Sequence, residues 1–199
     1  MNKGVWIALA GIDSAGKTTQ LSYLQQALSE LGYTVKSIAQ LETDLGKHVR
    51  DILKLDIEKC IKPWIRALIF GAVNYRLASL VKSYLMNNDF VITDRSPYCA
   101  FAYLIPQGIP RQWIQSIYRY CSYPDITIFI DVPVQIALTR KKMDKTIPIE
   151  MPSFLERVRD VYMEMVRQGQ IVYIDGTKSV KTVTNDIIKV VISGEKNEP

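Results

Sequence analysis

A glycine-rich phosphate-binding motif lies near the start of the chain, at residues 11–18. It reads Gly-Ile-Asp-Ser-Ala-Gly-Lys-Thr and matches the pattern GxxxxGK[ST]. In such a loop, backbone N–H groups wrap the phosphates of a nucleotide, the lysine reaches the β- and γ-phosphates, and the hydroxyl binds Mg²⁺. We expect Lys17 to act in catalysis, Thr18 to bind the metal and Thr19 to contact the α-phosphate. The residues predicted to bind ATP are Gly11, Ile12, Asp13, Ser14, Ala15, Gly16, Lys17, Thr18 and Thr19.

The surroundings of the motif narrow the class of protein. An apolar strand, Val5–Ala10, precedes it and an amphipathic helix, Lys17–Leu31, follows it, a context that a chance glycine-rich turn would lack. A GTPase would carry an Asn-Lys-x-Asp guanine reader, and the similar Asn-Lys-Gly-Val at residues 2–5 has the wrong end and position. A motor ATPase would usually be longer and would carry more acidic residues on its Walker-B strand. The pattern favours a small-molecule kinase that uses ATP with Mg²⁺.

Two further candidate catalytic residues, Asp94 and Arg95, follow the apolar run Phe90–Thr93. In open α/β sheets, ligands bind at the carboxyl ends of the strands. Asp94 could hold Mg²⁺ through water, and Arg95 could bridge two phosphate groups, because phosphoryl transfer depends on positioning and on charge stabilisation. The alternative is a salt bridge between neighbours at the strand end.

The elements that must position these residues alternate along the chain. Short apolar runs predict strands at Val5–Ala10, Val35–Ala39, Phe90–Thr93, Ile126–Asp131 and Ile171–Ile174. Helical periodicity predicts helices at Lys17–Leu31, Trp64–Met86 and Val180–Ile192, with another beginning near Phe154. This alternation is typical of an α/β fold with a parallel sheet. We expect one P-loop kinase domain over residues 1–192 and a polar, disordered tail at residues 193–199.

Composition excludes several other classes. The formal charge of +5 is spread along the chain and no nucleic-acid-binding signature is present, so we expect no nucleic-acid partner. No apolar run reaches 18 residues, which predicts a soluble, cytoplasmic protein without a membrane partner. Cys60, Cys99 and Cys121 lack metal-ligand spacing and His48 is the single histidine, so a zinc site is not expected.

Longer stretches of the chain resemble the thymidylate kinase family. Residues 9–21, Leu-Ala-Gly-Ile-Asp-Ser-Ala-Gly-Lys-Thr-Thr-Gln-Leu, are similar to that family's loop FEGxDxxGKTTQ. Other stretches resemble the family's LLFxA helix, DRY strand end, AY pair, PDxTxxLDVxPExALxR segment, late helix and last strand, in that order: residues 69–72, 91–95, 102–103, 124–140, 154–162 and 173–176. The resemblance runs from about residue 4 to residue 190.

The resemblance implies a fold and a reaction. The fold would be a P-loop NTPase fold with a five-stranded parallel sheet of order 2-3-1-4-5 and a short mobile lid at about residues 140–151. The reaction would transfer the γ-phosphoryl group of ATP to dTMP, giving dTDP, with Mg²⁺ as cofactor. The resemblance also suggests a homodimer formed through helices that include Trp64–Met86.

The resemblance further assigns roles to individual residues. Asp13 would contact the 3′-hydroxyl of the acceptor sugar, Phe70 would stack on its base, and Tyr103 would form the second wall. Arg95 would bridge donor and acceptor phosphates, and Arg140 would supply catalytic charge from the lid. The alternatives are a solvated loop carboxylate for Asp13, a core position for Phe70 and a solvated basic turn for the lid cations.

Departures from the family pattern concern mainly the acceptor. Asn74 stands where the family has an arginine that reads the base, and it could preserve or change pyrimidine preference. Leu41 replaces a cation that would hold the acceptor phosphate, for which Arg50 or Arg76 could compensate. Ser14 stands where some members have an arginine, so we expect the lid to carry that charge. Other acceptors (dUMP, UMP, CMP or a nucleoside) and a non-catalytic ATP-binding sensor remain alternatives.

Overall fold

The computed structural model describes residues 4–55, 61–142 and 151–193. Within them, five parallel strands form one sheet of order β2-β3-β1-β4-β5. The strands are β1 Val5–Ala10, β2 Val35–Ala39, β3 Phe90–Asp94, β4 Ile126–Asp131 and β5 Val172–Asp175. The predicted fold class and strand order are confirmed.

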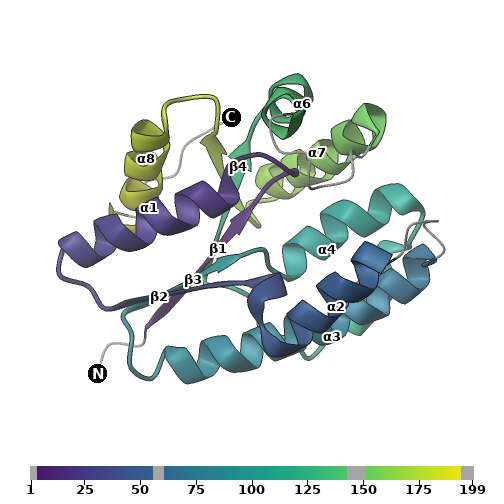
Figure 1. Ribbon diagram of the computed structural model, residues 1–199, viewed down its shortest axis with the longest axis horizontal. Helices are drawn as coiled ribbons and strands as arrows, with labels where there is room; N and C mark the ends of the chain where they lie inside the picture. Colours follow the sequence, from purple (N-terminus) through teal and green to yellow (C-terminus); the bar gives the residue numbers. More distant parts are fainter. Residues whose placement is uncertain (1–3, 56–60, 143–150, 194–199) are drawn as a thin grey trace.

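Helices connect successive strands and cover both faces of the sheet. The α-helices are α1 Lys17–Glu30, α2 Asp44–Leu55, α3 Pro63–Tyr84, α4 Pro97–Leu104, α5 Arg111–Ile117, α6 Val134–Lys142, α7 Pro152–Arg167 and α8 Val180–Ser193. Two short 3₁₀ turns are η1 Gln40–Glu42 and η2 Ile105–Gln107. Helices α1 and α8 pack together on one face of the sheet, whereas α3, α4 and α7 lie on the other (Figure 1).

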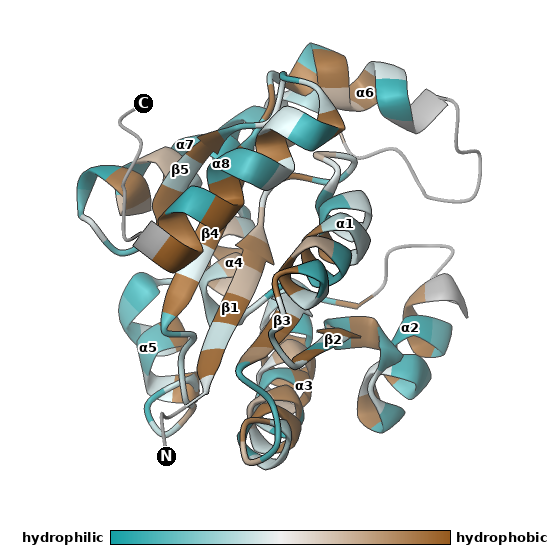
Figure 2. Cartoon of the chain, turned by 90° about the vertical axis from the view of Figure 1, so that its left-hand side faces the viewer, coloured by the Kyte–Doolittle hydropathy of each residue, from teal (hydrophilic) through white to brown (hydrophobic). Residues whose placement is uncertain are grey.

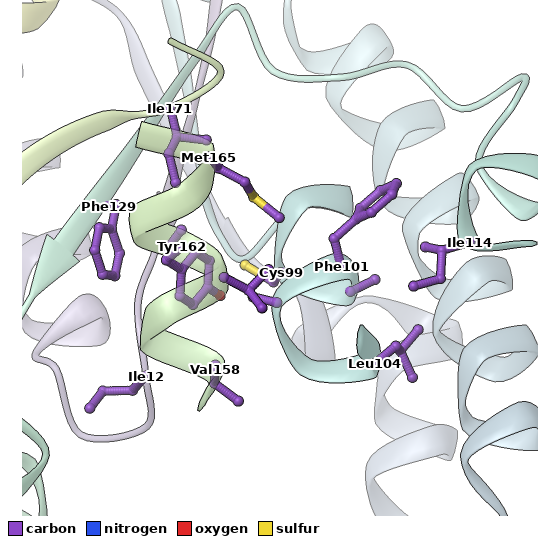
Figure 3. Packing of buried hydrophobic residues seen from close by; sticks show 14 of the residues in the cluster. Ile12, Cys99, Phe101, Leu104, Ile114, Phe129, Val158, Tyr162, Met165 and Ile171 are labelled. Carbon is purple, nitrogen blue, oxygen red and sulfur yellow. The ribbon is translucent and has the colours of Figure 1, made fainter. Parts of the chain in front are cut away.

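The core is divided between the two faces because side chains alternate along a strand. On β1, Ile7 and Leu9 pack with α1 and α8, whereas Trp6 and Ala10 pack on the side of α4 and α7. The central strands are apolar over most of their length, as expected for a parallel sheet covered on both faces (Figure 2). The second face is extended by packing between α7, α4 and α5, where Tyr162 lies next to Cys99 (Figure 3).

The parallel arrangement brings the carboxyl ends of the strands to one edge of the sheet. Leu9, near the end of β1, pairs with Asp94 at the end of β3, and Ile130 near the end of β4 pairs with Ile174 of β5. The loops that follow these strands therefore meet at this edge. The glycine-rich loop lies there, after β1 and before α1.

Three of the predicted strands have the bounds that the sequence indicated, and β3 and β5 each end one residue later than predicted. The predicted helices also occur, with ends that shift by one or two residues. Ser193 closes α8, so it belongs to the helix and not to the tail; residues 194–199 lie outside the described residues. Helices α2, α4, α5 and α6 were not predicted.

The segment expected to be a lid is described in part. Arg140 to Lys142 form the end of α6, so this end of the segment is helical. Met151 caps α7, and residues 143–150 lie outside the described residues. Among all the described residues, no helix is both long enough and apolar enough to span a membrane.

Candidate active site at the carboxyl edge of the sheet

The glycine-rich loop has the backbone geometry of a phosphate cradle. Gly11 has φ +149°, and a Cβ atom there would lie 2.7 Å from the carbonyl oxygen of Ile130. Gly16 has φ +96° and caps the N-terminus of α1, where free N–H groups and the helix dipole favour an anion. Both positions need glycine because the left-handed region disfavours a side chain.

Lys17 points back into this cradle. Its Nζ donates hydrogen bonds to the carbonyl oxygens of Ile12 at 2.9 Å and Gly11 at 3.2 Å, and its side chain is buried. Burial, followed by repulsion from Arg95, lowers the pKa of Lys17 below its ordinary value of 10.5. An anion in the loop would favour the charged form, so the site is electrostatically suited to a bound phosphate.

Thr18 and Asp94 form a group of oxygens beside the loop. The Thr18 hydroxyl donates to Asp94 Oδ2 at 3.0 Å, whereas Asp94 Oδ1 is buried and has no hydrogen-bond partner. A buried carboxylate oxygen left unpaired is costly unless a cation binds it. No cluster of three His, Cys, Asp or Glu side chains occurs in the described residues. This donor set fits Mg²⁺, which is commonly bound through one or two protein oxygens together with phosphates and water.

Asp13, Arg95 and Tyr103 meet on the α4 side of the loop. Arg95 Nη2 lies 2.5 Å from Asp13 Oδ1, and the Tyr103 hydroxyl donates to the same oxygen at 3.1 Å. The Arg95 guanidinium also lies over the Tyr103 ring, 5.2 Å from its centre. These residues, predicted from three separate motifs, are thus brought together as one partly buried cluster of a cation, an anion and an aromatic ring.

The two residues expected on α3 differ in their surroundings. Phe70 is half-buried, which is compatible with one wall of a site. Asn74 is 1% exposed and is fully engaged by the protein: its Nδ2 donates to the Phe70 carbonyl at 2.8 Å and to the Tyr118 hydroxyl at 3.0 Å, and its Oδ1 accepts from Gln40 Nε2 at 2.8 Å. The hypothesis that Asn74 reads the acceptor base has no support from this placement.

The arginines considered as substitutes for a cation at position 41 lie in exposed ion pairs. Arg76 donates two hydrogen bonds to Asp44 Oδ2 and one to its Oδ1. Arg50 pairs with Glu42.

A cavity lies next to the loop, on the α1 and α8 side of the sheet. It has a volume of about 200 Å³ and is lined by Ala15, Gly16, Thr19, Gln20, Ile130, Arg140, Gly176, Lys178, Val180 and Val183. Arg140 reaches across it from α6, and its guanidinium donates to the carbonyl oxygens of Ala15 at 3.3 Å and Gly176 at 3.2 Å. Arg140 therefore lines this cavity, whereas the cluster of Asp13, Arg95 and Tyr103 lies on the opposite, α4 side of the sheet.

One pair at the same edge was missed by sequence reasoning. Arg159 on α7 donates two hydrogen bonds, each 2.7 Å long, to the two carboxylate oxygens of Asp131 at the end of β4. Asp131 lies in a family-like segment, but nothing local indicates its partner, which is 28 residues further along the chain. The pair ties α7 to the strand that precedes α6.

Comparisons with known proteins agree with this geometry. A family model described as thymidylate kinase matches residues 9–187. The chain is similar to the probable thymidylate kinase of Methanosphaera stadtmanae, with 33% identity over 192 residues that cover 94% of this chain and 97% of the relative. It is also similar to the thymidylate kinase of Thermosipho africanus, with 34% identity and coverage of 94% and 97%, and to that of Fervidobacterium nodosum, with 31% identity and coverage of 94% and 98%.

Proposed function

Because the chain belongs to the thymidylate kinase family, we propose that it transfers the γ-phosphoryl group of ATP to the 5′-phosphate of dTMP, giving dTDP and ADP. The observation that carries this proposal is the meeting of a phosphate-binding loop with the Arg95, Asp13 and Tyr103 cluster at one edge of the sheet. A kinase that transfers a phosphoryl group between two nucleotides needs two anion sites side by side. The glycine-rich loop would form the donor site and Arg95 the acceptor site.

The donor phosphates would lie in the loop at residues 11–18. Lys17, now hydrogen-bonded to loop carbonyls, would turn to the β- and γ-phosphates and neutralise charge that develops during transfer. Thr18 and Asp94 would hold Mg²⁺, the latter directly or through water. The metal would neutralise charge on the donor phosphates and orient them for in-line attack.

The adenosine part of ATP would occupy the cavity lined by Arg140. This cavity adjoins the first turn of α1, where the phosphates would enter the loop. Its walls on α8 and after β5 are apolar or neutral apart from Lys178, and Arg140 lines it from α6. A planar guanidinium offers a stacking surface for a purine ring. Arg140 would therefore act on donor binding, and not as the transition-state cation that its position in the sequence first indicated.

The acceptor would lie on the α4 side of the loop. Arg95 would contact the acceptor phosphate and the transferred group, since two phosphate groups approach within reaction distance only when cations lie between them. Asp13 holds Arg95 through a charge-assisted hydrogen bond and would also accept one from the sugar hydroxyl. Tyr103 and Phe70 would border the sugar and the base.

We also propose that two copies of the chain pair through α3. Three large side chains on its first two turns are about half exposed, Trp64 at 47%, Ile65 at 50% and Leu68 at 56%, and Ile52 on the adjacent α2 is 49% exposed. Such a cluster is costly in water and is typical of an interface. Light scattering after size exclusion tests this proposal: a dimer that Leu68→Glu converts to a monomer supports it, and a wild-type monomer contradicts it.

The enzymatic proposal is tested by measuring ADP release with ATP·Mg²⁺ and a panel of acceptors, namely dTMP, dUMP, UMP, CMP, AMP, GMP and free nucleosides. Preferred turnover of dTMP, abolished in Lys17→Ala, supports it. Preference for another acceptor would refute the base assignment but keep the phosphotransferase. If no acceptor leads to ADP release while the protein still binds ATP, the result would favour a non-catalytic sensor.

A further inference from the structure

The backbone of Arg95 is held in an unusual conformation by two side chains that do not touch the reacting groups. Arg95 has φ +80°, which is rare and costly for a residue other than glycine. Its N–H donates to the Leu9 carbonyl on β1 at 2.9 Å, and its carbonyl accepts from the Thr93 hydroxyl at 3.0 Å. Both backbone groups of Arg95 are therefore fixed to the central strands of the sheet.

The Thr93 hydroxyl is itself oriented by a tryptophan on the neighbouring strand. The indole Nε1 of Trp6 donates to Thr93 Oγ1 at 3.0 Å in the buried core. An indole N–H can only donate, so the oxygen of Thr93 acts as acceptor there and its single proton must point to the Arg95 carbonyl. The donor and acceptor roles in the series of hydrogen bonds from Trp6 through Thr93 to Arg95 are therefore fixed by the chemistry of these groups.

This series of hydrogen bonds controls where the Arg95 side chain points. The left-handed conformation turns the chain sharply after β3, and the guanidinium meets Asp13 across the glycine-rich loop. Without the hydrogen bond to its carbonyl, residue 95 would lower its conformational energy by relaxing toward an ordinary negative φ. That change would move the guanidinium away from Asp13. Trp6 is 3% exposed and Thr93 is fully buried, so water cannot replace the lost hydrogen bonds.

We propose that Thr93, oriented by Trp6, is a positioning residue for Arg95 in phosphoryl transfer. The inference rests on the proposed function, because it concerns the same reaction, but it assigns a role to two residues to which the sequence analysis gave none. Neither residue lines the cavity next to the loop, and both lie on the opposite face of the sheet from α1 and α8.

The sheet supplies a matched control. Thr93 on β3 and Thr127 on β4 flank the same residue of β1, Ala8, and both threonines are buried. The Thr127 hydroxyl has no hydrogen-bond partner and does not reach residue 95. Thr127→Val therefore makes the same chemical change in the same layer of the core without touching the chain to Arg95.

The test combines Thr93→Val with variants of Arg95 and measures both kcat and thermal unfolding. Thr93→Val is expected to lower kcat at least tenfold, an effect on the order of that of a misplaced catalytic group, while Thr93→Ser, which keeps the hydroxyl, restores most of the rate. In an Arg95→Ala background, Thr93→Val should change the residual rate less than about twofold, because coupled groups are not additive. Thr127→Val should leave kcat within about twofold of wild type by the same reasoning.

The outcomes separate the inference from the proposed function. Equal losses of kcat on Thr93→Val with and without Arg95, or a lower unfolding temperature with unchanged kcat, would show a merely structural role and overturn the inference. Wild-type turnover of dTMP tests the proposed function independently of any variant. If the wild-type protein releases no ADP with any acceptor, the proposed function and the inference are overturned together.

Discussion

Replacing Arg140 by alanine distinguishes two interpretations of this residue. The position of Arg140 after the family-like segment predicts a lid cation that acts on the transition state. The structure instead has its guanidinium hydrogen-bonded to the carbonyls of Ala15 and Gly176, at the wall of the 200 Å³ cavity beside the loop. If that cavity binds the adenosine of ATP, the substitution should weaken binding of ATP and leave chemistry nearly unchanged.

The magnitude follows from the contacts. The two hydrogen bonds are long and their acceptors are neutral, so their loss alone should have a small effect on ATP binding. Loss of a planar cation stacked on a ring costs about 1–2 kcal/mol at a partly exposed site. This corresponds to an increase in KM for ATP of roughly 5- to 30-fold. Arg140→Lys keeps the charge but loses the plane, and should fall between wild type and Arg140→Ala.

The assay is the initial rate of ADP formation with saturating dTMP and varied ATP. We expect kcat of Arg140→Ala to stay within about threefold of wild type, as for loss of uniform binding. A fall in kcat of about a hundredfold at saturating ATP, with unchanged KM, is the signature of a transition-state interaction and would refute our reasoning. It would restore the interpretation that the sequence first favoured.

Three further predictions test other parts of the structure. Asn74→Leu removes three hydrogen bonds, two of them buried, and leaves the amide of Gln40 without this partner. It should therefore cost about 2–4 kcal/mol and lower the unfolding temperature by roughly 5–15 °C in calorimetry; a change below about 2 °C would contradict the importance of this network. The Arg76 guanidinium lowers the pKa of Asp44 from 3.8 to about 2. The small stabilisation that the ion pair gives the folded state is therefore complete above pH 4 and is lost as the pH falls through about 2. The difference in denaturation midpoint between wild type and Asp44→Asn should narrow over that interval, and a constant difference would disprove the assignment. Removal of divalent metal by EDTA should abolish turnover and Mg²⁺ should restore it, whereas Asp94→Asn should raise the Mg²⁺ concentration needed for half-maximal rate; metal-independent turnover would exclude the Thr18 and Asp94 metal site.

The parts of the fold that follow from local pattern could be predicted from the sequence. Strands β1 and β4 are short, largely apolar runs bounded by turn residues, so their limits are marked in the sequence itself. The meeting of the loop with Asp94 and Arg95 also follows, since parallel strands bring such residues to one edge. Helix α4 was missed because it is apolar on nearly every side and so lacks helical periodicity.

The parts of the site that depend on distant partners could not be predicted. Asn74 is engaged by Gln40 and Tyr118, which lie 34 and 44 residues away, and no local signal shows that these side chains meet. Arg140 contacts Gly176, 36 residues further on, so its side of the loop is decided by how α6 packs and not by its motif. Thr93 reads as an ordinary strand residue until Trp6, 87 residues earlier, is placed beside it.

The most direct test of the central claim is to identify the product. Purified protein is incubated with ATP·Mg²⁺ and dTMP, and nucleotides are separated by anion-exchange chromatography, with Lys17→Ala as control. We predict dTDP and ADP in equal amounts from the wild type and neither from the variant. ADP without dTDP would show hydrolysis in place of transfer, and no ADP would show that the protein does not turn over ATP; either result would contradict the account.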